Sequence, residues 1–214
     1  MCFNYFNLFV FISMHKYKLA TESKKLSPKM KNFEKHALIH PKKDDHRICR
    51  YIDNKTNKQC QMKLGNYPKF CQLHSLTIDN LYVDTSNIKN AGNGLFAGPF
   101  GFKKSDRIGE YSMDEIKVQL KDLDKRSSKP DYSYTFCERE KRGQAEDSVN
   151  CWDALDYRTT IIRYANDATN SKFKNNSYFF ETKRDGETRV YLVASKKIEP
   201  LEEIFVSYGS DYWA

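Results

Sequence analysis

The chain has 214 residues and a net charge of +8, with 39% hydrophobic and 30% charged residues. This length allows one medium domain together with a small module or a tail. The 14 Tyr and 14 Phe offset the modest hydrophobic fraction, because aromatic side chains bury large areas and favour strands over long helices. The apolar run at residues 3–14 is too short to span a bilayer and lacks a basic region before it, which argues against a membrane protein and a signal peptide.

The positive charge is concentrated at the N-terminal end. Residues 1–78 contain 15 Lys and Arg against 5 Asp and Glu, whereas the remaining residues contain 21 against 23. A basic arm therefore precedes a mildly acidic body. The arm can hold nucleic acid or another polyanion, although solvated Lys-rich tails are also common, and the body suits a basic substrate.

The predicted elements, in chain order, begin with a flexible basic arm over residues 1–48 and a small module over residues 49–78. Residues 79–214 form a third region of short apolar runs separated by Gly, Asn, Asp and Ser, a pattern typical of strands. Strands are predicted at residues 81–86, 94–97, 107–112, 177–183, 188–195 and 203–209. A short helix followed by a loop is predicted within residues 113–130, and Asp185-Gly186 predicts a hairpin turn.

Three cysteines and a histidine in the small module have the spacing Cys49-x10-Cys60-x10-Cys71-x2-His74. Three thiolates and one imidazole complete a tetrahedral structural zinc site and leave no position for a catalytic water. The surrounding segment is polar and needs such a staple to fold. The alternative is three reduced cysteines beside an incidental histidine. The six cysteines of the chain fit a reducing compartment better than a secreted disulfide scaffold.

Three separated motifs carry a family resemblance. They are Gly92-Asn93-Gly94-Leu95-Phe96-Ala97, Arg163-Tyr164-Ala165-Asn166-Asp167 and Ser207-Tyr208-Gly209, with Glu110-Tyr111, Ala194 and Lys197 to Glu203 at the expected places between them. Residues 79–214 resemble a SET domain of the protein lysine methyltransferases in order and spacing, and the small module resembles Cys-Cys-Cys-His zinc-binding modules. The resemblance implies an α+β, mostly β fold of short curled sheets with a C-terminal pseudoknot, preceded by a small zinc-stapled module.

The resemblance also implies S-adenosylmethionine as cofactor and a lysine that enters a narrow aromatic channel. Methyl transfer to an amine depends mainly on alignment of donor and acceptor. An apolar channel lowers the lysine pKa from about 10.4 by disfavouring the ammonium form, so no catalytic histidine is required. By family position, the cofactor would contact Gly92, Asn93, Gly94, Leu95, Tyr132, Arg163, Asn166, Asp167 and Trp213. The channel would be lined by Tyr134, Val206 and the catalytic Tyr208.

Several of these roles have plainer alternatives. Tyr132 and Tyr134 can be ordinary strand aromatics, and Trp213 can be a core anchor. Val206, two residues before the catalytic tyrosine, is small and apolar, so we expect di- or trimethylation. Asp167 stands where the family has His, Leu201 stands where it has Gly, and no cysteine-rich segment follows Trp213.

The sequence therefore predicts a protein-lysine methyltransferase that acts on a histone tail or another basic protein in the nucleus, with the cytoplasm as the alternative location. The rival interpretation is a non-catalytic SET-like protein that binds chromatin or nucleic acid through residues 1–78. No membrane partner is expected.

Overall fold

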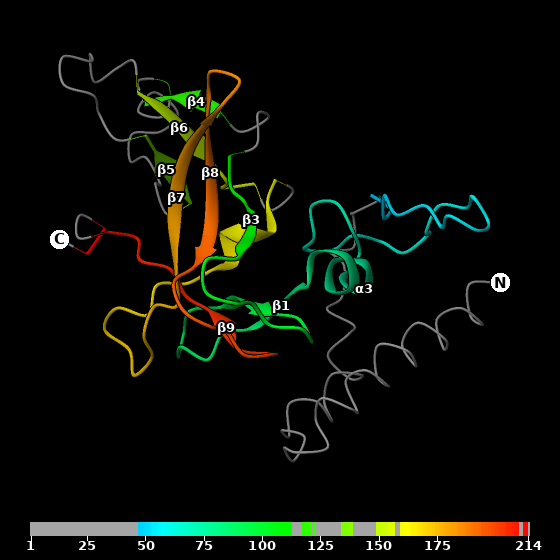
Figure 1. The fold of residues 1–214 in the computed structure, drawn as a ribbon, viewed down its shortest axis with the longest axis horizontal. Helices are drawn as coiled ribbons and strands as arrows, with labels where there is room; N and C mark the ends of the chain where they lie inside the picture. Colours follow the sequence, from blue (N-terminus) through cyan, green and yellow to red (C-terminus); the bar gives the residue numbers. More distant parts are fainter. Residues whose placement is uncertain are drawn as a thin grey trace. The chain divides into compact units, whose positions relative to one another are not determined.

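Short antiparallel strands in three small sheets make up most of the fold (Figure 1). The structure is a computed structural model, and the residues that it describes belong to one compact unit. These residues are 47–112, 117–120, 122, 134–138, 149–156, 159–209, 212 and 213. Almost all of the predicted arm over residues 1–48 lies outside the described residues. Tyr132 and most of the predicted helix and loop at 113–130 also lie outside them.

The first sheet has the strand order β1–β2–β9, formed by Leu81–Thr85, Asn93–Ala97 and Glu203–Ile204. Strand β2 lies in the middle, and its last four residues are buried, as expected for a strand with a neighbour on both sides. The strands predicted at 81–86 and 94–97 are confirmed. The strand predicted at 203–209 begins correctly but is shorter, because Phe205 and Val206 pair with other segments.

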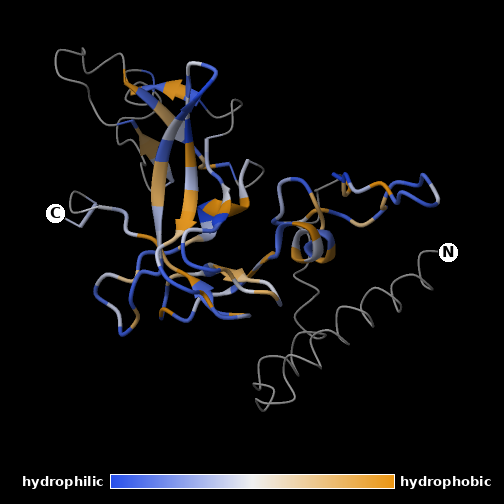
Figure 2. Ribbon diagram, viewed as in Figure 1, coloured by the Kyte–Doolittle hydropathy of each residue, from blue (hydrophilic) through white to orange (hydrophobic). Residues whose placement is uncertain are grey.

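The second sheet has the order β3–β8–β7, formed by Arg107–Glu110, Glu187–Ala194 and Ser177–Arg184. Strands β7 and β8 form the long hairpin in Figure 1, with β3 beside β8. The predicted turn is confirmed: Asp185 and Gly186 both have positive φ, at 53° and 82°, as the tight turns that match the strand twist require. Figure 2 shows hydrophobic residues concentrated in the C-terminal half of β8, where they enter the core.

The third sheet has the order β4–β6–β5, formed by Lys117–Gln119, Asn150–Asp153 and Thr135–Cys137. The sequence predicted a short helix in the first part of 113–130; of the described residues there, Leu120 and Asp122 are helical, whereas Lys117–Gln119 is a strand. Lys117–Gln119 pairs with β6 instead, because Val118 packs on Val149 and Cys151. Strands β5 and β6 were not predicted.

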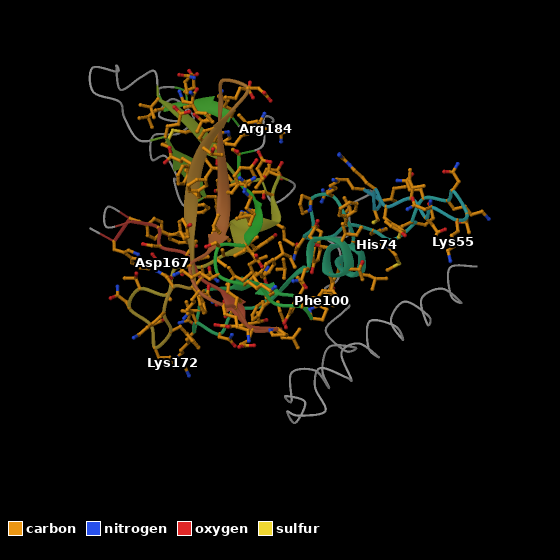
Figure 3. The ribbon with its side chains drawn as sticks, in the orientation of Figure 1. Lys55, His74, Phe100, Asp167, Lys172 and Arg184 are labelled. Carbon is orange, nitrogen blue, oxygen red and sulfur yellow. A yellow bond between two sulfur atoms is a disulfide. The ribbon has the colours of Figure 1, made fainter. Side chains whose placement is uncertain are left out.

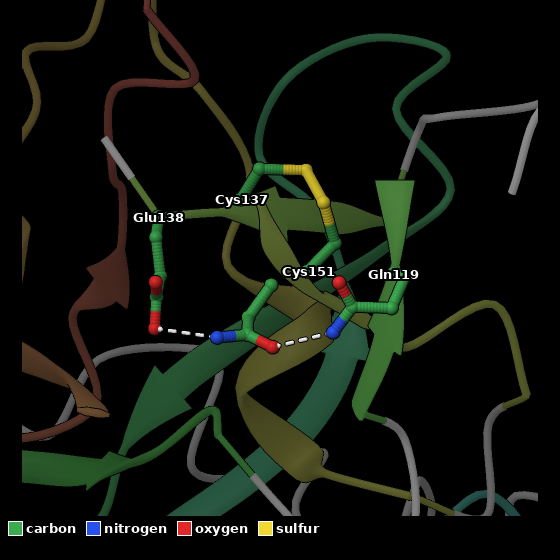
Figure 4. The surroundings of a disulfide bond; sticks show 5 residues. Gln119, Cys137, Glu138 and Cys151 are labelled. Atoms are coloured by element: carbon green, nitrogen blue, oxygen red, sulfur yellow. Dashed lines mark hydrogen bonds between the residues drawn. A yellow bond between two sulfur atoms is a disulfide. The ribbon is translucent and has the colours of Figure 1, made fainter. Parts of the chain in front are cut away.

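A disulfide joins Cys137 on β5 to Cys151 on β6 (Figure 4). It crosses a directly opposed pair of residues in the sheet. Beside it, Gln119 donates to the Asn150 side chain over 2.8 Å, and Asn150 donates to Glu138 over 3.3 Å. The expectation of reduced cysteines did not anticipate this bridge, because the pairing depends on two strands that the local sequence does not mark.

The Cys/His module begins with a hairpin over residues 47–64, followed by the short helix α3 (Gln72–His74) and a π-helical turn, η1 (Ser75–Asp79). Asp53 organises the tip of this hairpin by accepting hydrogen bonds from the backbone of Lys55 and Thr56. The module has a small core of its own around Cys49, Leu64 and Cys71.

Tyr67 joins the module to the main body. Its side chain is only 3% exposed and lies in the main core. Its hydroxyl oxygen accepts the Val83 amide over 3.0 Å, and the Tyr164 hydroxyl donates to the Asn66 carbonyl over 3.3 Å. The main core draws side chains from all three sheets, including Leu95, Leu192 and Trp152.

The C-terminal segment crosses back between two earlier segments. Phe205 forms a parallel bridge with Asn166, and Val206 forms one with Ser177. The fully buried Asn176 fixes this crossing, since it accepts the Phe205 amide over 2.8 Å and donates to the Glu203 carbonyl over 2.8 Å. The predicted fold class, mostly β with a C-terminal pseudoknot, is confirmed. Among the described residues, no helix is long and apolar enough to cross a membrane.

Candidate active site

The glycine turn before β2 is the first part of the site. Gly92 has a φ of +71° and open space where a side chain would begin, and Asn93 is exposed. Gly94 serves a different purpose, because a Cβ there would overlap the carboxylate of Glu203. That buried carboxylate accepts the Ser86 hydroxyl and the Asn87 amide, each over 2.6 Å. Glu203 thus holds the turn from beneath and leaves its outer side accessible.

Asn166 connects this turn to the crossing segment. Its side-chain amide donates to the Asn93 carbonyl over 2.9 Å, and its own carbonyl accepts the Val206 amide over 2.9 Å. Residues 93, 166 and 206 are far apart in sequence, so only the C-terminal crossing brings them together. The prediction placed Asn93 and Asn166 in one site, and the structure brings them into contact.

Asp167, labelled in Figure 3, is the most heavily hydrogen-bonded side chain of the site. One carboxylate oxygen accepts the Tyr208 amide over 2.8 Å and the Trp213 indole over 3.0 Å. The other accepts the backbone and hydroxyl of Thr169 and the side chain of Asn175. Burial favours a higher pKa, but these donors outweigh it and lower the pKa of Asp167 to about 2. The group is therefore an anion at neutral pH.

Tyr208 lies half-buried against the core, and its hydroxyl donates to the Ala165 carbonyl over 2.9 Å. Burial, with smaller contributions from Tyr212, Tyr134 and Asp167, raises the pKa of this phenol above its ordinary value. The phenol therefore keeps its proton at neutral pH and cannot act as a general base there. Its hydroxyl oxygen can still accept a hydrogen bond from an incoming amine.

Arg163 and Tyr134 form the adjoining wall. The guanidinium lies 3.9 Å from the centre of the Tyr134 ring and donates to the Ala154 carbonyl over 2.6 Å and the Leu155 carbonyl over 3.1 Å. The Tyr134 carbonyl accepts the buried Tyr111 hydroxyl. Arg163 thus holds the ends of β5 and β6 together, and its charge rests on an aromatic face.

Comparison with known proteins identifies the family. The SET domain family matches residues 92–209, which is more than half of the chain. The chain belongs to the SET-domain family. No curated protein sequence matches the chain.

Solved structures with a similar arrangement include other SET proteins. ATXR5 in complex with mono-methylated histone H3.1 has a TM-score of 0.49 and 19% identity, with 61% of this chain and 57% of that chain covered. CpSET8 from Cryptosporidium has a TM-score of 0.44 and 20% identity, with coverages of 61% and 57%. The ctPRC2 complex, in an autoinhibited conformation bound to S-adenosylmethionine, has a TM-score of 0.46 and 22% identity, with coverages of 60% and 15%. The chain therefore spans less than two thirds of each of these chains.

Two residues that the SET resemblance assigned to the site have buried side chains. Leu95 is 0% exposed and Val206 is 1% exposed, and both pack in the main core. Leu95 can reach a cofactor only through its backbone. Trp213 is 45% exposed, packs edge-on against Tyr212 and is held by Asp167, so it is not a core anchor.

The sequence assigned no role to three residues that support the SET site. Glu203 holds the glycine turn, Asn176 holds the crossing, and Tyr111 reaches the Tyr134 carbonyl. Glu203 and Tyr111 lie in the family motifs, which could have marked them. Asn176 carries no local signal.

The Cys/His module brings all four predicted ligands together. The Sγ atoms of Cys49, Cys60 and Cys71 and a ring nitrogen of His74 lie within 4.8 Å of one another. The Sγ atoms of Cys49 and Cys71 each lie 3.3 Å from His74 Nδ1. The Tyr51 ring stacks on the His74 ring with 3.9 Å between the ring centres. The Cys71 amide donates to the Cys49 sulfur over 3.2 Å. This donor set and its closeness suit a tetrahedral zinc ion.

Proposed function

We propose that this protein is an S-adenosylmethionine-dependent protein-lysine N-methyltransferase acting on a basic protein, with a histone tail as the leading candidate. The observation that carries the proposal is the crossing that joins Asn93, Asn166 and Tyr208 at one site. SET-domain membership supplies the reaction type. The mildly acidic body favours a basic substrate, and a histone substrate implies a nuclear location.

The cofactor fits the accessible rim of the site. The open side of Gly92 and the exposed Asn93 permit close approach of a ligand to the backbone, and Asn166 presents an amide beside them. We assign the cofactor to this rim, formed by Gly92, Asn93, Gly94 and Asn166. The backbone of Leu95 and the residues Arg163, Asp167, Trp213 and Tyr132 would surround it. When bound, the cofactor supplies an electrophilic methyl group on a sulfonium.

The chain's own residues orient the substrate amine. Tyr134 and Tyr208 supply the aromatic walls of the channel, where an apolar surrounding favours the neutral amine. The Tyr208 hydroxyl is fixed by its bond to the Ala165 carbonyl, so its oxygen has a defined position toward the amine. Alignment of amine and methyl group is the main requirement of this displacement. The small Val206 beneath the channel leaves room for a second or third methyl group.

A structural zinc ion in the Cys49, Cys60, Cys71 and His74 cluster completes the proposal. All four positions of a tetrahedron are then filled by protein, so the ion stabilises the module and takes no part in methyl transfer.

One observation favours a second candidate, a non-catalytic SET-like protein that binds chromatin or nucleic acid. Asp167 replaces the family's His and is fully engaged with the chain's own donors, so it offers less to a ligand. The two candidates differ in whether the protein binds the cofactor at all.

The deciding experiment measures transfer of labelled methyl groups from S-adenosylmethionine to mixed core histones by wild type and Tyr208→Phe. We expect the label to fall at least about tenfold in the variant, which corresponds to about 1.4 kcal/mol of barrier. Tyr178→Phe is the matched control, because Tyr178 is 43% exposed on β7, and it should retain activity.

If no label is transferred to histones, calorimetric measurement of cofactor binding distinguishes the two candidates. Cofactor binding without histone labelling would direct the search to another basic protein. Failure to bind the cofactor would exclude the methyltransferase and support the non-catalytic candidate.

A further inference from the structure

The hairpin over residues 47–64 has two faces of different character. Its bridges pair Ile48 with Lys63 and Ile52 with Gln59, which sets the register of the whole hairpin. Alternate residues of a strand point to opposite sides. Cys49, Tyr51 and Cys60 therefore lie on the side of the Cys/His cluster, as the stacking of Tyr51 on His74 confirms.

The opposite side, here called the outer face, carries two basic and two glutamine side chains together with two exposed isoleucines. Its members are Ile48, Arg50, Ile52, Gln59, Gln61 and Lys63, and all six are exposed. Lys55 and Lys58 extend the positive charge to the hairpin tip, where Figure 3 shows Lys55 at the end farthest from His74. Residues 47–64 contain five Lys and Arg and a single acidic residue, Asp53.

The single acidic residue is directed away from the outer face by its hydrogen bonds. The Asp53 carboxylate accepts two backbone amides and the Thr56 hydroxyl within the tip turn. Arg50 and Lys63 face each other diagonally across the ribbon, and Arg50 also lines an open pocket with Arg47 and Gln59. The outer face is therefore a basic strip about two strands wide.

A two-stranded ribbon of this kind fits the major groove of B-form DNA. The groove is about 12 Å wide and admits such a ribbon, whose strands pair about 4.8 Å apart. The Arg50 amide donates to the Lys69 carbonyl over 3.1 Å, so the segment around Lys69 lies along one edge of the ribbon and leaves the outer face exposed. Lysine and arginine neutralise phosphates, and arginine and glutamine are the side chains that pair with guanine and adenine edges. The hydrogen bond from Gln59 to the Cys49 carbonyl, 3.0 Å long, fixes that side chain in place.

We propose that the outer face of the 47–64 hairpin binds double-stranded DNA in the major groove, with Arg50 and Lys63 as its main contacts. The Cys/His cluster lies on the other face and joins both strands of the ribbon, through Cys49 and Cys60, to Cys71 and His74. This binding is independent of methyl transfer, since it uses no residue of the SET site. An acidic protein segment offers negative charge without a groove, so the fit of the ribbon favours the duplex.

The test measures fluorescence anisotropy of a labelled, mixed-sequence DNA duplex of about 20 base pairs with the full chain at several salt concentrations. The variant is the double substitution Arg50→Gln with Lys63→Gln. The matched control is Lys103→Gln with Lys104→Gln, which removes the same charge from an exposed turn of the SET body.

We expect the hairpin variant to bind DNA at least about tenfold more weakly near 0.1 M salt. The slope of log affinity against log salt concentration should also be smaller by about two, one for each lost phosphate contact. The control should change affinity by less than about threefold, since it removes charge but no contact. Unchanged thermal melting of both variants excludes loss of folding as the cause.

Three results would overturn the proposal. Equal losses in the hairpin and control variants would show that only total charge matters. An equal loss on an RNA duplex, whose deep, narrow major groove excludes side chains, would show that the groove is not read. Polyglutamate serves as a third ligand, and a loss confined to it would assign the face to an acidic protein instead.

Discussion

At Asp167 a carboxylate takes the place of the family's histidine and becomes an anchor for the end of the chain. It receives the Tyr208 backbone and the Trp213 indole on one oxygen and two further residues on the other. A histidine offers at most one acceptor nitrogen, so it could not hold both Tyr208 and Trp213 in this way. Asp167 therefore fixes Trp213 directly to the site.

We expect Asp167→Asn to destabilise the protein by about 2 kcal/mol at neutral pH, because charge-assisted hydrogen bonds to a buried carboxylate are lost. The folded-state pKa of Asp167 is about 2, below the ordinary value of 3.8. Its stabilisation is thus complete above about pH 4 and is lost as the pH falls toward 2. Denaturant unfolding of wild type and variant at pH 7 and near pH 3 should show a smaller difference at the lower pH.

The control is Asp106→Asn, because Asp106 is exposed and its side chain accepts the Lys103 amide in a surface turn. It should cost less than about 1 kcal/mol. If the difference between wild type and Asp167→Asn were the same at both pH values, the anchor would not act through its charge.

Among the secondary-structure elements, the sequence predicted those that carry a local signal. The β7–β8 hairpin has alternating residues around Asp185-Gly186, and β1 and β2 flank a glycine turn, so each strand is marked within its own residues. Strands β4, β5 and β6 are short, and their stability depends on the cross-strand contacts of Val118, Val149 and the Cys137–Cys151 pair. Such contacts join residues far apart in sequence, which local patterns do not reveal.

The same distinction applies to the site. The motif order indicated Asn166 and Tyr208, but the support beneath them is non-local. Glu203 reaches Ser86, 117 residues earlier, and Asn176 holds both sides of the crossing. The expected contact of Gly94 with the cofactor stays a prediction, and the structure adds that the missing side chain at this position makes room for Glu203.

The close approach of Glu203 on β9 to β2 therefore requires a glycine at position 94. The substitution Gly94→Ala tests this requirement. The added methyl group would push the Glu203 carboxylate away from Ser86 and Asn87. We expect a loss of about 2–4 kcal/mol from overpacking and broken hydrogen bonds, measured by denaturant unfolding. Gly186→Ala is the control, because it has open space and suffers only the left-handed backbone strain, about 1 kcal/mol. A cost at Gly94 no larger than that at Gly186 would contradict the steric argument.

At the scale of the whole molecule, the Cys/His module and the SET body are joined through Tyr67, which accepts the Val83 amide inside the main core. We expect purified protein to contain about one zinc ion per chain, and we expect its removal by a chelator to unfold the module, because a polar segment of this size cannot fold without its metal. Hydrogen exchange should then speed up at the Cys49, Cys60 and Val83 amides, while the β7–β8 hairpin stays protected. Cys71→Ser should reproduce the change without a chelator. Full metal content in that variant, or unchanged exchange at Val83 after zinc removal, would contradict the predicted dependence.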